Sequence, residues 1–267
     1  MFTIKKTFMS NDNQIYSKVI SELIKDKNSS ILIIGAQLAD RNAFYNAGFR
    51  NVLLSGFDER EMAYEPFEWI KENGMSLSFN EQSFDYVVTH AVLHHMSSPH
   101  RGLTEMYRVA KKGVLVFESR DSLLMQIAEK LGLTQKYEVA GCYPTSGVDG
   151  TNIPNYIYRW TEREIEKTIN TYAPAFKHKF TYKYWSIYPD GPDLSSTKKL
   201  LLKLVRPFYF LFVNIFPKQQ NGLVFFIEKP TNENSLLPWL FYDNNKKIDV
   251  DTNWINQYYK KSRNKKK

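Results

Sequence analysis

The sequence predicts an α/β fold whose central sheet is mostly parallel and carries helices on both faces. Short, mainly apolar runs occur at residues 31–34, 84–89 and 114–117. Runs of this kind are typical of strands that helices cover on both sides. Segments with helical periodicity separate them. This alternation of strands and helices implies right-handed crossover connections in a parallel sheet.

The composition is that of a globular chain. The 267 residues are 43% hydrophobic and 24% charged, which allows a sizeable buried core. We expect one domain over residues 1–230 and a polar C-terminal extension with a basic tail over residues 231–267.

In the first half, local signals place each element. Ile15, Val19 and Leu23 lie on one helical face, and glycines follow both the first strand and the next helix. The expected elements are a helix at 14–26, a strand at 31–34, a helix at 39–47, a strand at 52–54, a helix and then a loop at 59–72, a strand at 84–89, a helix at 99–109, a strand at 114–117 and a helix at 122–131.

In the second half, the pattern loosens. Residues 133–160 are rich in Gly, Pro, Tyr and Asn, and we expect a lid-like loop there. Thr161 and Glu164 form the sequence signature of a capping box that opens a helix. A strand at 176–187, a helical insertion at 189–220 and a last strand at 223–228 complete the expected domain.

The single cysteine, Cys142, excludes a disulfide framework within the chain and agrees with a cytoplasmic location. The first residues contain no apolar stretch of the secretory kind, so no signal peptide is expected. The longest apolar run, residues 207–216, is shorter than the about 20 residues that a membrane-spanning helix needs.

In parallel sheets, ligands bind at the carboxyl ends of the strands. The segments to inspect are therefore 35–40, 55–60, 89–95 and 118–121. Gly35 allows a tight turn with close approach of a ligand to the backbone. Asp58 follows the second strand, where a carboxylate can accept hydrogen bonds from ribose hydroxyls.

Two sequence blocks resemble the class I S-adenosylmethionine-dependent methyltransferases. Residues 83–95, SFDYVVTHAVLHH, are similar to that family's fourth-strand motif. Pro99, Leu103, the Glu105-Met106 and Arg108-Val109 pairs and residues 112–116 resemble its next helix, turn and fifth strand. The resemblance covers residues 30–131 and implies a Rossmann-like methyltransferase sheet with an antiparallel last strand. It also implies S-adenosylmethionine as cofactor and is strongest for bacterial small-molecule and sugar-pathway enzymes.

The family's functional positions carry over only in part. The family has Gly-x-Gly-x-Gly after an acidic first strand, but this chain has Gln37 and Ala39 at two of the glycines and Ile33 at the acid. Asp40 stands just after the loop and could replace that acid. The expected cofactor-binding residues are Gly35, Ala36, Gln37, Asp40, Asp58, Asn73 and His90.

The histidines are the candidates for catalysis. We expect His94 or His95 to act as a general base for an acceptor hydroxyl. His90 and His94 have the i, i+4 spacing of metal ligands on a helix, but no carboxylate near them in sequence offers a third ligand. No metal is therefore expected.

The lid-like loop holds the expected acceptor-binding residues. Aromatic and amide side chains suit a sugar ring or a polar aromatic acceptor. The candidates are Tyr143, Asn152, Asn155, Tyr156, Tyr158, Arg159 and Trp160. Residues 206–212 are expected to form a docked helix, with contact to a membrane or a lipid-linked acceptor as the alternative.

The expected function is methyl transfer to an oxygen or nitrogen of a small molecule, with a sugar in surface-polysaccharide synthesis as one candidate. A first alternative is a non-catalytic scaffold protein, because side chains at Gln37 and Ala39 narrow the cofactor loop. A second is a nucleic-acid methyltransferase, suggested by the net charge of +8. It ranks last because six of the basic residues lie in the last eight positions and no Asn-Pro-Pro-Tyr-like motif follows the fourth strand.

Overall fold

A computed structural model describes residues 9–57, 64–139, 146–186, 188, 195–230 and 235–264. In chain order the elements are α1 (Met9–Leu23), β1 (Ile31–Ile34), α2 (Leu38–Asn46), β2 (Val52–Gly56), β3 (Glu68–Lys71), β4 (Phe84–His90), η1 (Leu93–His95), α3 (Pro99–Val109), β5 (Ala110–Ser119), α4 (Leu123–Lys130), η2 (Val148–Gly150), α5 (Glu162–Tyr172), β6 (Lys179–Trp185), α6 (Ser196–Ile215), η3 (Pro217–Gln219), β7 (Gly222–Glu228), β8 (Leu240–Tyr242), β9 (Ile248–Val250) and α7 (Thr252–Asn264).

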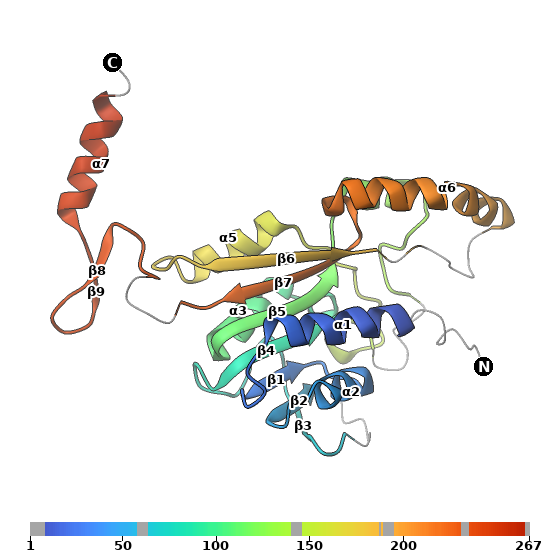
Figure 1. Ribbon diagram of the computed structural model, residues 1–267, viewed down its shortest axis with the longest axis horizontal. Helices are drawn as coiled ribbons and strands as arrows, with labels where there is room; N and C mark the ends of the chain where they lie inside the picture. The colour runs from blue at the N-terminus through green and yellow to red at the C-terminus, as the bar shows by residue number, and fades with distance from the viewer. Residues whose placement is uncertain are drawn as a thin grey trace.

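The main sheet has seven strands in the order β3-β2-β1-β4-β5-β7-β6 (Figure 1). The strands from β3 to β5 are parallel, and β7 is antiparallel to both β5 and β6. This confirms the predicted Rossmann-like sheet with an antiparallel last strand. One expectation is wrong: a helix and loop were predicted for residues 59–72, but residues 68–71 form the edge strand β3. Four residues with no clear periodicity carried too little signal to predict a strand.

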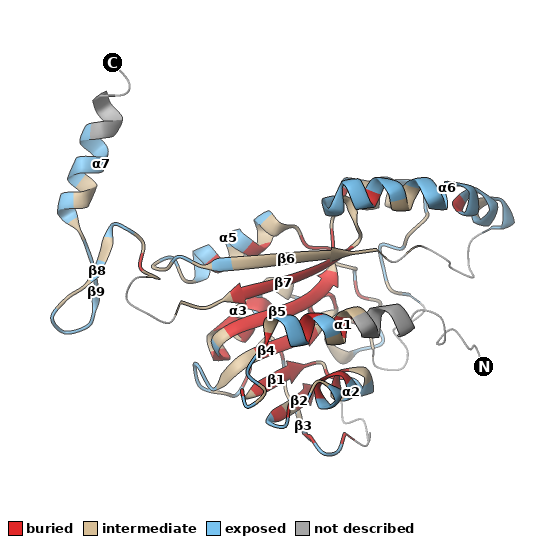
Figure 2. Cartoon of the chain, viewed as in Figure 1, coloured by how far each residue is buried: buried red, intermediate tan, exposed pale blue. Residues whose placement is uncertain are grey.

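Helices cover both faces of the sheet, as the uninterrupted apolar strands require. Ile31 and Ile33 point to the face that α1 and α2 cover, and Leu32 and Ile34 point to the face of α3 and α5. Figure 2 shows the buried strands between these helices. The period-two alternation of one strand therefore contributes to two cores.

The helices α4 and α6 lie at the carboxyl ends of the strands rather than on a face. Figure 1 shows α6 beyond the end of β6, and Figure 2 shows most of its surface exposed. No helix among the described residues is both long enough and apolar enough to cross a bilayer. At the opposite end of the molecule, β8, β9 and α7 extend away from the sheet (Figure 1).

Candidate functional site

A narrow cleft lies where β1, β2 and β4 end. The chain turns at Gly35, whose φ of 66° is in the left-handed region that glycine adopts without strain. The cleft has a volume of about 80 Å³, and its lining includes Gly35, Gly56, Phe57, Asn73, Val92, His95 and Asp149. Two of the expected cofactor residues, Gly35 and Asn73, therefore meet in one place.

The side chains that replace the family's glycines do not close this cleft. Gln37 precedes α2 with an extended φ of −121°, and its side chain is exposed. The next side chain, Leu38, is 44% exposed. Within residues 35–40, Gly35 alone has a positive φ. Since a Cβ is penalised only in that conformation, this backbone accommodates Gln37 and Ala39 without strain.

Other groups narrow the cleft. A Cβ on Gly35 would lie 2.5 Å from both methyl groups of Val92, so that side chain already packs against the turn. The segment of η2 covers the opening, since the Ser97 N–H donates to Asp149 Oδ1 at 2.9 Å and Gly150 packs on the Phe57 ring. In this conformation the cleft is well below the volume of about 300 Å³ at which ligand pockets begin.

Asp40 and His90 lie deeper and on another side of the β1 tip. Asp40 is buried, and its Oδ2 accepts the Gln37 N–H at 2.7 Å, which caps α2. The Asp40 carboxylate also lies 3.9 Å from His90 Nδ1. Burial raises the pKa of Asp40, and the neighbouring His90 opposes this rise. The expected cofactor residues thus divide into two groups. Ala36 is buried, and Asp58 lies outside the described residues.

A second, larger cavity of about 530 Å³ opens between the ends of β4 and β5 and the helices α4 and α6. Apolar side chains make up most of its lining. Polar groups come from Glu118, Arg159, Gln219 and Asn221, and His90 and Ala91 form its floor at the end of β4. Its volume is in the range that small-molecule sites occupy.

A buried ion pair separates the cleft from the cavity. Glu118 is the next-to-last residue of β5, its side chain is fully buried, and its Oε2 lies 2.7 Å from His94 Nδ1. The other oxygen accepts the Leu93 N–H at 2.7 Å. Although burial alone lowers the pKa of His94, the charges of Glu118 and Glu138 and the hydrogen bond to Glu118 raise it to about 10. His94 is therefore an imidazolium at neutral pH.

His95 has the opposite electrostatic environment. Burial and the neighbouring charge of His94 lower the pKa of His95, so its ring is neutral at pH 7. Its Nε2 lies 3.4 Å from Glu138 Oε2, and His94 Nε2 lies 3.6 Å from the same oxygen. The close contact with the charged His94 lowers the pKa of Glu138.

These three residues could hold a metal ion. One ligand atom each from His94, His95 and Glu138 lies within 4.8 Å of the others. The sequence interpretation considered His90 and His94 and found no carboxylate near them along the chain; the fold brings Glu118 and Glu138 to His94 from later segments. No local signal identified Glu138, whereas Glu118 stands in a strand tip that the sequence marked for inspection.

The lid-like loop places its residues in several environments. Arg159 lines the cavity and forms an ion pair with Glu129. Asn155 is buried and donates to the His94 carbonyl oxygen at 3.2 Å. Tyr156 is exposed and packs edge-on against Tyr137.

Two further residues of that loop pack or hydrogen-bond within the protein and do not line the cavity. Trp160 is fully buried in the core beneath α3 and α5, which corrects the expectation that it faces an acceptor. The Tyr158 hydroxyl donates to Glu164 at 2.9 Å and lies outside the cavity lining. Tyr143 and Cys142 lie outside the described residues.

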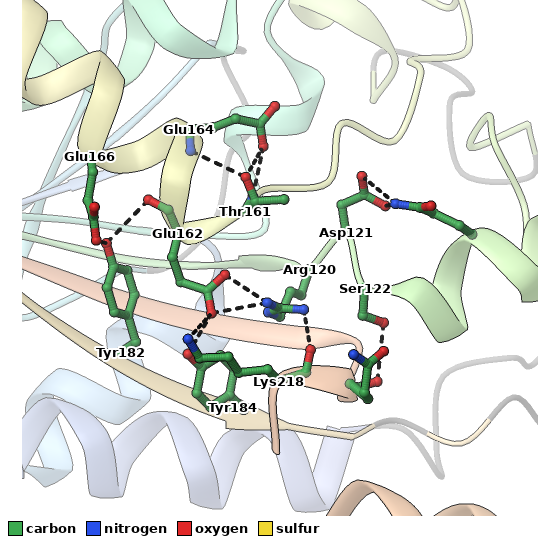
Figure 3. A network of polar contacts seen from close by, with 12 residues as sticks. Arg120, Asp121, Ser122, Thr161, Glu162, Glu164, Glu166, Tyr182, Tyr184 and Lys218 are labelled. Atoms are coloured by element: carbon green, nitrogen blue, oxygen red, sulfur yellow. Dashed lines mark hydrogen bonds and ion pairs between the residues drawn. The ribbon is translucent and has the colours of Figure 1, made fainter. Parts of the chain in front are cut away.

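A polar network fixes the elements around the cavity (Figure 3). Arg120, just after β5, donates to both Glu162 oxygens at 3.0 and 2.7 Å and to the Lys218 carbonyl oxygen in η3. The Tyr184 hydroxyl donates to Glu162 at 2.6 Å. Thr161 and Glu164 form the predicted capping box of α5. The end of β5, the start of α5 and η3 are thereby joined.

Comparisons with known proteins agree with this geometry. Residues 51–117 match a family described as a methyltransferase domain. A search of curated proteins finds no match. Among solved structures, YcgJ from Bacillus subtilis is similar, with a TM-score of 0.51, 13% identity and coverage of 83% of this chain and 99% of that one.

Two further structures are similar. The complex of the Haloferax volcanii Trm112 methyltransferase activator with a candidate methyltransferase has a TM-score of 0.51 and 11% identity. The match covers 83% of this chain and 92% of that one. The Synechocystis magnesium protoporphyrin IX methyltransferase with bound S-adenosylhomocysteine has a TM-score of 0.49 and 12% identity, and the match covers 82% of this chain and 84% of that one. Strand order and the similar solved structures show that this chain has the class I S-adenosylmethionine-dependent methyltransferase fold, and residues 51–117 match the methyltransferase-domain family within it.

Proposed function

We propose that the protein transfers a methyl group from S-adenosylmethionine to an oxygen or nitrogen of an acceptor in the 530 Å³ cavity. The observation that carries this proposal is the position of the His94 and His95 pair. His95 lines the narrow cleft, and Glu118, the partner of His94, lines the cavity. Donor and acceptor sites would then meet at one histidine pair.

The cleft residues have the chemistry that the cofactor needs. Gly35 presents bare backbone at the end of β1, and Asn73 offers an amide whose oxygen already accepts the Met75 N–H at 2.9 Å but retains a second lone pair. The remaining expected residues stay proposed contacts of the cofactor: Ala36, Gln37, Asp40, Asp58 and His90. When bound, the cofactor supplies an electrophilic methyl group. To admit it, the η2 segment has to move away from Ser97 and Phe57.

His95 is the better candidate for the general base. A base must be unprotonated at the working pH, and the lowered pKa of His95 ensures this. His94 is protonated and held by Glu118, so we assign it a positioning role. Its charge keeps the neighbouring His95 neutral, and its ring lies 4.5 Å from that of His95. His95 lines the cleft and not the cavity, so an acceptor hydroxyl has to extend from the cavity past the His94–Glu118 pair for this ring to take its proton.

The acceptor that we propose is a small molecule that carries a hydroxyl or an amine, with a sugar as the leading class. The support is the set of polar side chains in a mainly apolar lining, which includes Ser119, Thr134, Arg159, Tyr188, Tyr209, Gln219 and Asn221. Hydroxyl, guanidinium and amide groups hydrogen-bond to sugar hydroxyls.

Calorimetry with S-adenosylhomocysteine tests the donor site. We expect micromolar binding to the wild type and its loss in Gly35→Val, because that position requires φ > 0 and has no space for a side chain. Leu38→Val, on an exposed side chain of the same loop, is the matched control and should bind normally. Absence of heat from the wild type at high ligand concentration would instead support the scaffold interpretation.

A further inference from the structure

The helix α6 presents an apolar face to solvent. At about 100° of rotation per residue, eight exposed side chains fall within an arc of about 140°. They are Leu200, Leu201, Leu204, Val205, Phe208, Leu211, Phe212 and Ile215. Phe208 is 72% exposed, and the helix touches the rest of the protein through the opposite side, at Leu202 and Val213. A contiguous apolar stripe of this length on a protein surface marks an interaction site.

Basic residues lie on the side of the helix away from this stripe. Lys199, Lys203 and Arg206 are exposed, and α6 contains no acidic residue. At about 100° per residue they fall about 60–120° beyond the edge of the stripe, next to the buried side. A helix with a wide apolar face and a basic polar face has the character of a helix that lies in the interface of an anionic membrane. A protein partner with an apolar patch would not by itself account for the one-sided charge.

The helix α4 extends the same surface. Leu123, Ile127 and Leu131 occur at i, i+4 and i+8 and are exposed. Lys198 Nζ, from the first turn of α6, donates to the carbonyl oxygens of Leu131 and Gly132 at 3.3 and 3.1 Å. The two helices are thus tied at this end.

The network of Figure 3 ties them at the other end. Ser122, the N-cap of α4, donates to the Gln219 carbonyl oxygen at 3.2 Å, and Arg120 holds η3 directly after α6. The two helices are therefore tied to each other at one end and to the end of β5 at the other.

The large cavity opens within this surface. Val205 from α6 and Ile127 and Leu131 from α4 line the cavity and are also exposed to solvent, so they form its mouth. Leu202, Leu124 and Ala128 continue the apolar wall inward, toward Glu118. A molecule entering between the helices would pass its apolar part along this wall.

We propose that α4 and α6 form a docking surface for an anionic membrane, and that the cavity between them takes the apolar part of a lipid-linked acceptor drawn from that membrane. The second part rests on the proposed function, because it places the acceptor in the cavity that Glu118, the partner of His94, lines. The first part depends only on the surface.

Vesicle flotation tests the surface. We expect the full chain to float with phosphatidylcholine vesicles that contain phosphatidylglycerol and to bind weakly to pure phosphatidylcholine. Phe208→Glu should abolish flotation, since it places a charge in the apolar stripe. Lys203→Glu with Arg206→Glu should weaken it by at least about tenfold. Phe241→Glu, a matched exposed aromatic on β8 at the far end of the molecule, should leave it unchanged (Figure 1).

Farnesyl phosphate tests the cavity. The measurement is the rise in the thermal unfolding temperature of the protein when this ligand is added. We expect protection in the wild type and its loss in Val205→Glu, whose exposed mouth position tolerates the charge during folding. No protection of the wild type overturns the proposal for the cavity.

The outcomes separate the proposals. No flotation of the wild type, or a dimer in solution that Phe208→Glu dissociates, overturns the membrane surface and assigns the stripe to a second copy. S-adenosylhomocysteine binding without flotation overturns this inference alone. Flotation without S-adenosylhomocysteine binding leaves the docking surface standing and overturns the proposed function.

Discussion

The narrow cleft and the large cavity lie on two sides of the His94–Glu118 pair and differ in almost every respect. The cleft, of about 80 Å³, is built by the turns after β1, β2 and β4 and is covered by η2. The cavity, of about 530 Å³, is built by α4, α6 and the ends of β5 and β7, and is open and mainly apolar. The same sheet thus supports a closed site and an open one.

The two hollows also come from different parts of the chain. The cleft lies almost entirely within the N-terminal half, which includes the match to the methyltransferase domain at residues 51–117. Most of the cavity lining comes from residues after 117. Relatives of the same fold can keep the first region while the second changes with the acceptor.

The largest expected effect comes from breaking the ion pair between the two regions. His94→Ala leaves the Glu118 carboxylate buried without its partner, which costs about 3–5 kcal/mol of unfolding free energy. Urea denaturation measures this loss. His95→Ala, whose side chain is partly exposed, is the control and should cost much less. Equal losses in the two variants would contradict the buried pair.

The next effect separates acceptor from donor binding. Ala128→Trp fills the cavity from α4 without touching the cleft. We expect kcat/KM for the acceptor to fall by about 10–100-fold, since displacing the acceptor from its reacting position removes the benefit of alignment. The dissociation constant of S-adenosylhomocysteine should stay within about twofold of wild type. A parallel loss of both would show that the two sites are one.

A smaller effect concerns the cover of the cleft. Asp149→Ala removes the hydrogen bond from Ser97 that holds η2 down, worth about 0.5–1.5 kcal/mol. The open state becomes more populated, so S-adenosylhomocysteine should bind about two- to tenfold more tightly. Calorimetry measures this gain, and Asp121→Ala is a control on the cavity side. A weaker affinity would show that Asp149 contacts the ligand instead.

The smallest effect depends on pH. The folded-state pKa of His94 is about 10, above its ordinary value of about 6.5, so its pairing stabilises the fold fully below that ordinary value and is lost as pH rises through about 10. The stability difference between wild type and His94→Gln should therefore shrink between pH 8 and pH 10.5. Nitrogen NMR should show His94 doubly protonated at pH 8 and His95 neutral. A neutral His94 at that pH would contradict the assignment.

Much of the fold could be predicted from the sequence, because each strand and helix has its own periodicity. The uninterrupted apolar runs led to β1, β4 and β5, and the capping box led to the start of α5. The short edge strand β3 was missed, since its four residues have little pattern. In the site, Gly35, His94 and His95 follow from their positions at strand ends. Glu138 does not, because nothing local links it to histidines more than forty residues earlier.

The sequence by itself determined the order of the strands and helices, the tips at which chemistry could occur and the apolar character of α6. These are local properties, written in the spacing of apolar and polar residues along each element. Only the tertiary structure decided that η2 covers the cleft and that Glu118 and Glu138 keep His94 protonated. It also decided that Trp160 is buried and that the apolar face of α6 stays exposed. Each of these depends on which distant segments meet, and periodicity within one segment carries no information about its partner.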